Sequence, residues 1–213
     1  MKINVEIVSY SLINDAVKIE NLNEKELVPK MMIRRRLSRS SKIFIYLASE
    51  TGFKTGNVVY GSAYGELIDS VSILESINNK TIVSPSSFQN SVYNTAASYH
   101  SIISGNKSEI STISSGDNTS HTIMKEAGLV LQRVDEVFVC SIEAMNFKGV
   151  EKINRCDNDL EYGIAFVLRK TNDKATLVVD SISELCVPKS LEWMKSLYDL
   201  CRKDKRNIVE IEL

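Results

Sequence analysis

The strongest constraint on this chain is the alternation of short apolar runs with longer segments whose apolar residues recur every three to four positions. The first pattern is typical of β-strands and the second of amphipathic helices. Strand-type runs occupy residues 3–9, 57–61, 109–114, 136–142 and 208–211, and a hairpin is expected for 164–169 and 176–180. Helices are expected over 27–48, 66–78, 92–103, from 118 or 119 to about 133, and 191–201. This order predicts one α/β domain over residues 1–213, with a mixed sheet of about five strands layered with helices.

Two polar stretches interrupt the pattern. Residues 84–91 are expected to form a connector that carries Pro85 and Phe88, and residues 146–161 a mobile loop. Neither stretch has the periodicity of a helix or a strand, so both are expected to lie at the surface.

Composition argues against several classes of function. The chain has 213 residues, 43% of them apolar, and a formal net charge of −1. A charge so close to zero gives no overall basic field for nucleic acid or for an anionic membrane surface. No apolar run approaches the roughly 20 residues that cross a bilayer, and the alternating start predicts a strand rather than a signal peptide. We therefore expect a cytoplasmic protein without a membrane span.

Metal and cofactor chemistry are not expected. The four cysteines, Cys140, Cys156, Cys186 and Cys201, form no C-x-x-C pair, and the chain has two histidines. This pattern does not suit a zinc site, and reduced thiols in the cytosol are the simplest interpretation. Because Cys140 falls in an apolar strand, we expect it to be a core residue.

Three blocks, in order along the chain, carry a resemblance to a known family. They are residues 59–67, which pass from a strand into a glycine-flanked turn; residues 84–98, which begin with Ser-Pro and contain Asn-Thr-Ala-Ala; and residues 110–144, with a strand, a turn, a helix and a second strand. Together they resemble the N-terminal half of a β-ketoacyl synthase. The resemblance is nearest to short ketosynthase-like proteins of aryl-polyene-type type II polyketide pathways, which lack the nucleophilic cysteine. It implies half of a thiolase-type fold.

The turn in the third block departs from the family. In ketosynthases a cysteine stands there, where the helix N-terminus lowers the thiol pKa and backbone amides face the thioester oxygen. This chain has Ser114-Ser115-Gly116-Asp117, and Asp117 adds negative charge. The family's two catalytic histidines belong to its C-terminal half, which lies beyond this chain, and His100 and His121 match neither of them.

These departures imply a subunit without catalytic residues of its own. The resemblance implies a heterodimer with a full-length catalytic ketosynthase, which supplies the cysteine and the histidines, while this chain acts as a chain-length-factor-like subunit. An acyl carrier protein would be reached through that partner. Two alternatives stay open: an altered acyl hydrolase or transferase that uses Ser115 as its nucleophile, and a structural scaffold. The flanking sequence lacks the first glycine of a Gly-x-Ser-x-Gly turn, and no histidine is placed by sequence as a base.

The resemblance also assigns an interface. In the family, the second block lies at the dimer interface and reaches toward the partner's acyl tunnel. The residues expected there are Phe88, Val92, Tyr93 and Thr95. The strand that pairs across the two-fold axis corresponds to residues 109–114, which makes Ile110, Thr112 and Ile113 the candidate dimer-strand residues.

A basic cluster is the last candidate site. Arg34, Arg35, Arg36 and Arg39, with Lys30 and Lys42 beside them, form the densest group of positive charges in the chain. Carrier proteins are acidic, so these arginines are candidates for carrier docking. A solvated face or an interface with the partner subunit explains the same pattern.

Overall fold

A mixed sheet organises the chain. The computed structural model describes residues 1–14, 22–145, 160–179, 187–203 and 207–213. Within these ranges the strands are β1 (Lys2–Asn14), β2 (Asn57–Gly61), β3 (Ile110–Ile113), β4 (Glu136–Met145), β5 (Leu160–Lys170) and β6 (Ile208–Glu212). They form one six-stranded sheet in the order β3-β2-β4-β5-β1-β6. The neighbours β3, β2 and β4 are parallel, and β4, β5, β1 and β6 pair antiparallel. The predicted mixed α/β sheet is confirmed.

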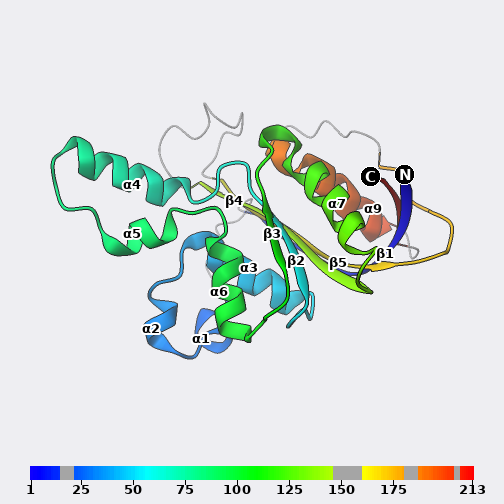
Figure 1. Ribbon diagram of the computed structural model, residues 1–213, viewed down its shortest axis with the longest axis horizontal. Helices are drawn as coiled ribbons and strands as arrows, with labels where there is room; N and C mark the ends of the chain where they lie inside the picture. Colours follow the sequence, from blue (N-terminus) through cyan, green and yellow to red (C-terminus); the bar gives the residue numbers. More distant parts are fainter. Residues whose placement is uncertain (15–21, 146–159, 180–186, 204–206) are drawn as a thin grey trace.

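Helices cover both faces of this sheet (Figure 1). One face carries α3 (Arg39–Glu50) and α6 (Thr95–Ser104), and the other carries α7 (Thr119–Val130) and α9 (Glu192–Lys203). Shorter elements connect them: α1 (Glu24–Leu27), α2 (Met31–Arg34), and the 3₁₀ turns η1 (Gly116–Asn118) and η2 (Lys189–Leu191). Each face of the sheet therefore has its own apolar core.

Strand β4 shows how the sequence builds both cores at once. Side chains of a strand point alternately to its two faces. Val137 and Val139 pack in the cluster under α7 and α9, whereas Phe138, Cys140 and Ile142 pack in the cluster under α3 and α6. Every residue of β4 after Glu136 is buried, as a central strand covered on both faces requires.

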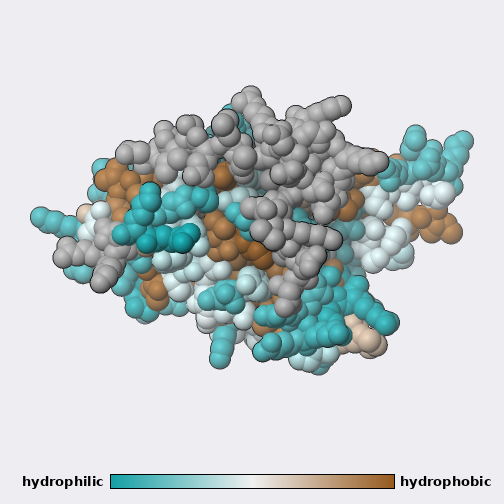
Figure 2. All heavy atoms as spheres, turned by 180° about the vertical axis from the view of Figure 1, so that it is seen from behind, coloured by the Kyte–Doolittle hydropathy of each residue, from teal (hydrophilic) through white to brown (hydrophobic). Residues whose placement is uncertain are grey.

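An arm projects from this layered body. It consists of α4 (Leu67–Asn78) and α5 (Pro85–Asn90), which lie at one end of the molecule (Figure 1). No residue of α4 is buried, although half of its residues are Leu, Ile or Val. Apolar atoms are visible among the polar ones at this end in the view from behind (Figure 2). We call residues 67–93 the α4–α5 arm.

The single helix predicted over residues 27–48 is wrong. The segment forms α1, α2 and α3 instead, with breaks before Met31 and before Arg39. Val28 leaves the helical conformation, with φ −131° and ψ 76°, because it precedes Pro29, and proline disfavours the helical conformation at the residue before it. Ser38 then starts a new helix, since its extended backbone lets its hydroxyl accept a hydrogen bond from the Ser41 amide at 3.1 Å.

Two further local predictions are wrong. The connector predicted over residues 84–91 is largely helical, because Ser84 caps α5 and Pro85 occupies its first turn. The hairpin predicted between 164–169 and 176–180 does not form: β5 pairs with β4 and β1, and Leu177 makes a single parallel bridge to Val209. Of the loop predicted over 146–161, residues 146–159 lie outside the described residues, and 160–161 begin β5.

Candidate functional site

The carboxyl ends of the parallel strands meet at one edge of the sheet. Gly61 of β2 is in register with Ile113 of β3 and with Ser141 of β4. The turns that follow β2 and β3, residues 62–66 and 114–118, therefore leave the sheet side by side. This is the edge at which α/β sheets place their functional loops.

Glu143 holds this edge together from inside. Its carboxylate is fully buried and accepts four hydrogen bonds. The donors are the Ser62 hydroxyl at 2.9 Å, the Ala63 amide at 2.7 Å, the Tyr64 amide at 3.3 Å and the Ser190 hydroxyl at 2.8 Å. The carboxylate thus ties β4 to the turn after β2 and to η2.

Burial sets the protonation of Glu143. Removal from water raises the pKa of its carboxyl group, and the four hydrogen bonds oppose that rise. A carboxyl group with four donors around it has no lone pair left for a substrate. We therefore assign Glu143 a positioning role: it fixes the conformation of residues 62–64.

The turn expected to match the nucleophile position is exposed and is closed by local hydrogen bonds. Ser114, Ser115, Gly116 and Asp117 are all exposed, and Gly116 takes a left-handed conformation with φ +55°. The Thr119 hydroxyl closes the turn, because it accepts from the Ser115 amide at 3.0 Å and donates to the Gly116 carbonyl at 2.7 Å. A side-chain cap by Asn118 does not form, and α7 ends at Val130 rather than near Arg133.

Within the described residues neither histidine pairs with Ser115, and a basic group that contacts this turn is Lys189, whose Nζ lies 3.8 Å from the Asp117 carboxylate. His100 is buried on the other face of the sheet, where its ring stacks on Phe53 with centroids 5.6 Å apart, and burial lowers its pKa to about 4. His121 lies 6.0 Å from the Trp193 ring, and neither histidine forms a hydrogen bond with Ser115. A serine without a base is a weak nucleophile.

The described cysteines offer no substitute. Cys140 is fully buried in β4, and burial raises the pKa of its thiol far above the ordinary value. Cys201 is also buried, with a pKa raised to about 12 by burial. Thiols in this condition stay protonated and inert. The expectation that Cys140 is a core residue is confirmed, while Cys156 and Cys186 lie outside the described residues.

The arm meets the site through Tyr93. The Tyr93 ring packs on Gly65, where an added Cβ would lie 2.9 Å from the ring, and Gly65 has a left-handed φ of +58°. The Tyr93 hydroxyl donates to the Ala63 carbonyl at 3.4 Å, and the Ser114 hydroxyl donates to the same oxygen at 3.3 Å. The structure thus brings together two residues predicted separately, one as a tunnel residue and one in the degenerate turn.

The other predicted tunnel residues differ in exposure. The side chains of Phe88 and Val92 are 70% and 50% exposed, so both face away from the chain's own core. Thr95 is buried, and its hydroxyl donates to the carbonyls of Asn90 and Val92 at the start of α6. Phe88, Val92 and Tyr93 therefore form an apolar surface beside the site, and Thr95 supports it from inside.

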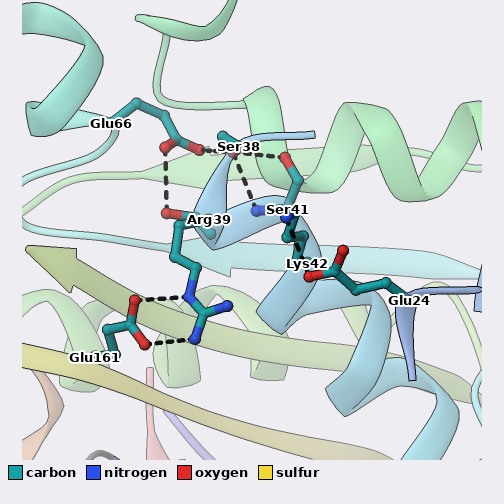
Figure 3. Close-up of polar contacts among 8 residues, drawn as sticks. Glu24, Ser38, Arg39, Ser41, Lys42, Glu66 and Glu161 are labelled. Carbon is teal, nitrogen blue, oxygen red and sulfur yellow. Dashed lines mark hydrogen bonds and ion pairs between the residues drawn. The ribbon is translucent and has the colours of Figure 1, made fainter. Parts of the chain in front are cut away.

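A second buried carboxylate anchors the root of the arm. Glu66 precedes α4 and accepts hydrogen bonds from the hydroxyls of Ser38 at 2.6 Å and Ser40 at 3.3 Å (Figure 3). Burial raises the pKa of Glu66 to about 7; Asp69 adds to the rise, and the two serine hydroxyls oppose it. This carboxyl group joins α4 to the start of α3.

The structure divides the basic cluster. Arg39 makes a two-pronged contact with Glu161, with both N···O distances 2.6 Å, and Lys42 pairs with Glu24 at 3.0 Å (Figure 3). Arg34 donates to the backbone carbonyls of Val28 and Pro29. Arg35 and Arg36 are exposed. Only part of the predicted carrier-docking set therefore presents its charge to the outside.

Strand β3 forms the open edge of the sheet. The carbonyl of Glu109, just before β3, accepts a hydrogen bond from the Val58 amide of β2 at 3.0 Å. The carbonyl of Ile113 accepts one from the Ser62 amide, just after β2, at 3.3 Å. Because the backbone groups of a strand alternate in direction, those of Ile110 and Thr112 point away from β2. Among the described strands none lies on that side.

Other kinds of site are not found within the described ranges. No group of three or more His, Cys, Asp or Glu side chains there could hold a metal ion. No helix in the same part of the chain is long and apolar enough to cross a membrane.

Sequence analysis missed Glu143, Ser190 and Glu66 as site residues. The signal for Glu143 was present: an acidic residue inside the otherwise apolar run of residues 137–145 needs a buried set of donors. Nothing in the sequence pointed to Ser190, because its contact with Glu143 spans 47 positions.

Comparisons with known structures agree with this geometry. A solved structure of the ketosynthase ApeO in complex with its chain length factor ApeC, from Xenorhabdus doucetiae, contains a similar chain with a TM-score of 0.73 and 18% identity. The match covers 95% of this chain and 93% of that one, so the two have nearly equal lengths. No curated protein sequence matches.

Two larger chains have the same fold over part of their length. The ishigamide ketosynthase/chain length factor matches with a TM-score of 0.63 and 14% identity, over 80% of this chain and 63% of that one. A β-ketoacyl synthase from Burkholderia phymatum STM815 matches with a TM-score of 0.53 and 14% identity, over 80% and 60%. These likenesses establish the fold, which is half of a thiolase-type ketosynthase. The family model for the N-terminal domain of β-ketoacyl synthases matches residues 14–197, and the chain therefore belongs to this family.

Proposed function

We propose that this chain is a non-catalytic, chain-length-factor-like subunit that forms a heterodimer with a full-length ketosynthase. The observation that carries the proposal is the turn after β3. By the sequence resemblance it corresponds to the family's nucleophile turn, yet in place of a cysteine it holds exposed Ser115, and neither histidine of the chain forms a hydrogen bond with it. The partner would supply the cysteine and histidines for decarboxylative condensation on a carrier-bound malonyl unit.

Two surfaces support an assembly of this kind. β3 is an edge strand with outward-pointing backbone groups, which is a template for pairing with another chain. The α4–α5 arm exposes apolar side chains, and Tyr93 links it to this edge by its hydrogen bond to the Ala63 carbonyl in the turn after β2. The chain of nearly equal length in the ApeO–ApeC complex makes the same arrangement plausible for this one.

The exposed residues of the arm suit a role in the partner's acyl tunnel. Phe88 stands among serines, glutamine and asparagine, yet it is 70% exposed. Leaving a phenylalanine in water forgoes about 1.5–3 kcal/mol of burial free energy, so a covering surface is expected. We infer that Phe88 and Val92 enter the wall or the floor of that tunnel, in an aryl-polyene-type type II polyketide pathway. Carrier protein would dock mainly on the partner, with Arg35 and Arg36 as candidate contacts on this chain.

The test is reconstitution with a full-length ketosynthase from the same organism. We expect the tagged chain to retain the ketosynthase through size-exclusion chromatography. The pair should elongate acyl-carrier protein with malonyl-carrier protein, while this chain alone gives no product. Ser115→Ala in the pair should leave the elongation rate unchanged. Elongation by the isolated chain, lost in Ser115→Ala, would overturn the proposal, and so would a failure of the two chains to associate.

Product length tests the tunnel assignment separately. Phe88→Ala should lengthen the products of the intact pair, because it removes bulk from the wall, and Val92→Trp should shorten them. Dimer content is measured in parallel by light scattering. If both variants form intact dimers and give the parent product masses, these residues only pack at the interface.

A further inference from the structure

A second concave surface lies outside the site described above. It is a groove of about 560 Å³ between α2, α5 and α6, which lie together at one end of the body (Figure 1). Its lining residues are Lys30, Met31, Met32, Ile33, Arg36, Gln89, Tyr99 and Ile102. The volume falls in the range of small-molecule sites, which are about 300–1,000 Å³.

The walls of the groove are apolar and uncovered. Met31 and Met32 are 51% and 75% exposed, and Ile102, across the groove on α6, is 65% exposed. α2 buries none of its residues. Methionine side chains are flexible and polarizable, so they adapt to ligands of irregular shape. On the opposite wall, Gln89 donates to the Tyr99 hydroxyl at 3.4 Å, which closes the groove between α5 and α6.

Two positive charges flank this apolar surface without compensation. Lys30 and Arg36 are exposed, and within the described residues neither side chain forms an ion pair or a hydrogen bond. No lining residue is acidic. The neighbouring cations differ: Arg39 and Lys42 are paired with Glu161 and Glu24. Arg35 is exposed as well, but it does not line the groove, so Lys30 and Arg36 are the cations of the cluster that face the apolar walls.

We propose that this groove binds an amphipathic monoanion, such as a medium-chain carboxylate. The apolar chain would lie on Met31, Met32 and Ile102, and the anionic head would sit between Lys30 and Arg36. An anion there gains charge-assisted hydrogen bonds, and its chain is removed from water against the apolar walls. The groove shares α5 with the arm and Arg36 with the candidate carrier contacts, so its ligand binding is measured on this chain alone, without ketosynthase or carrier protein.

Calorimetric titration of the full chain with decanoate tests the charge complementarity. Saturable binding with one site per chain is expected. The double variant Lys30→Gln/Arg36→Gln should weaken decanoate binding about tenfold or more, a loss of two charge-assisted contacts. Decanol has the same chain but no charge. It should bind the parent more weakly than decanoate does, and the double variant should bind decanol and decanoate with equal affinity. Arg202→Gln/Lys203→Gln, two exposed cations of α9, is the matched control and should change nothing.

The apolar wall is tested by Met32→Ser, which should weaken both ligands because it removes contact area. Thermal unfolding confirms that each variant is folded; Lys30, Met32 and Arg36 are exposed, so all are expected to fold. Three outcomes would overturn the proposal: no saturable binding of decanoate to the parent, equal binding to the double variant, or equal affinity for decanol and decanoate. Binding only to vesicles of anionic phospholipid, without binding of soluble decanoate, would also contradict it and would indicate a membrane-surface role.

Discussion

Strand β4 and helix α4 are both rich in apolar residues, yet they bury them very differently. Every residue of β4 after Glu136 is buried between two helical layers, whereas α4 buries none of its twelve residues. The layered body is thus stabilised by its own contacts. The arm is held at its root by Glu66 and Tyr93, and Leu74, Ile77 and Phe88 are among its apolar side chains that stay exposed. The contrast indicates that the body supplies the fold and the arm supplies a surface for something else.

The largest effect is expected inside the body. Glu143→Ala removes an acceptor from two backbone amides and two hydroxyls, all at the buried edge of the sheet. Unpaired buried donors cost about 1–3 kcal/mol each, so we expect a loss of about 4 kcal/mol in the free energy of unfolding, measured in urea. Glu75→Ala on the exposed arm is the control and should change little. A loss below about 1 kcal/mol at Glu143 would show that the turn does not depend on this carboxylate.

The next effect concerns the edge of the body. Thr112→Pro removes an outward-pointing N–H and leaves the ladder with β2 intact, so the isolated chain should keep its stability. Association with the ketosynthase should weaken by about 1–3 kcal/mol, the cost of one lost ladder hydrogen bond, read from the dissociation constant. Ile113→Pro is the matched contrast: its backbone faces β2, so it should destabilise the chain itself. Unchanged association of the Thr112 variant would place the interface elsewhere.

The junction of body and arm should respond to pH. Glu66 has a pKa of about 7 in the folded chain, above its ordinary 4.5, so its protonated form favours folding. The contribution of Glu66 to the free energy of unfolding should therefore fall by about 2 kcal/mol as pH rises from 5 to 8. His100 has the opposite effect on stability. Its folded pKa of about 4 lies below its ordinary 6.5, so its contribution to the free energy of unfolding falls as pH drops below about 6.5.

Glu66→Gln isolates this contribution, since the amide still accepts from Ser38 and cannot ionise. His100 and Asp69 remain in both proteins, so the difference between the two stability curves reports Glu66. The parent should lose stability relative to the variant between pH 5 and 8 in urea unfolding. Parallel curves for the two proteins would mean that Glu66 titrates normally.

The smallest effect on stability is expected on the arm. Leu74→Ser and Ile77→Ser replace side chains that are 65% and 60% exposed, so the isolated chain should change by no more than about 0.5 kcal/mol. If the arm docks on a ketosynthase, the same substitutions should reduce complex formation in size-exclusion chromatography. Destabilisation of the isolated chain by more than about 1 kcal/mol would show that the arm packs on the body, and that body and arm do not differ in how they bury their apolar residues.

The sequence predicts the body well because periodicity reports local environment. The strands around residues 3–9, 57–61, 109–114, 136–142 and 208–211 and the helices around 66–78, 92–103 and 191–201 are all present. The predicted hairpin fails because β5 pairs with β4 and β1, and pairing partners far apart in the chain leave no local signal. The predicted helix over 27–48 fails because the apolar spacing continues across Ser38, although Ser38 caps a new helix there.

The site was only partly predictable. Tyr93 and Ser114 were singled out for different roles, but their shared contact with the Ala63 carbonyl depends on the register of β2 and β3. The roles of Glu66 and Glu143 depend on burial, which sequence composition does not give for an acidic residue. Arg39 had been grouped with surface arginines, and its contact with Glu161 spans 122 positions.

The pairing of β1 has a consequence for how the chain is made. Val5 is in register with Lys170 on β5 and with Val209 on β6, so among the described strands β1 pairs with the two that lie furthest along the chain. Until these two strands are made, the apolar face of β1 lacks its neighbours, while β2, β3 and β4 can already assemble. Pairings this distant in sequence slow folding and expose the nascent chain to aggregation. The joining of β1 to the sheet is therefore expected to be a late and slow step when the chain refolds.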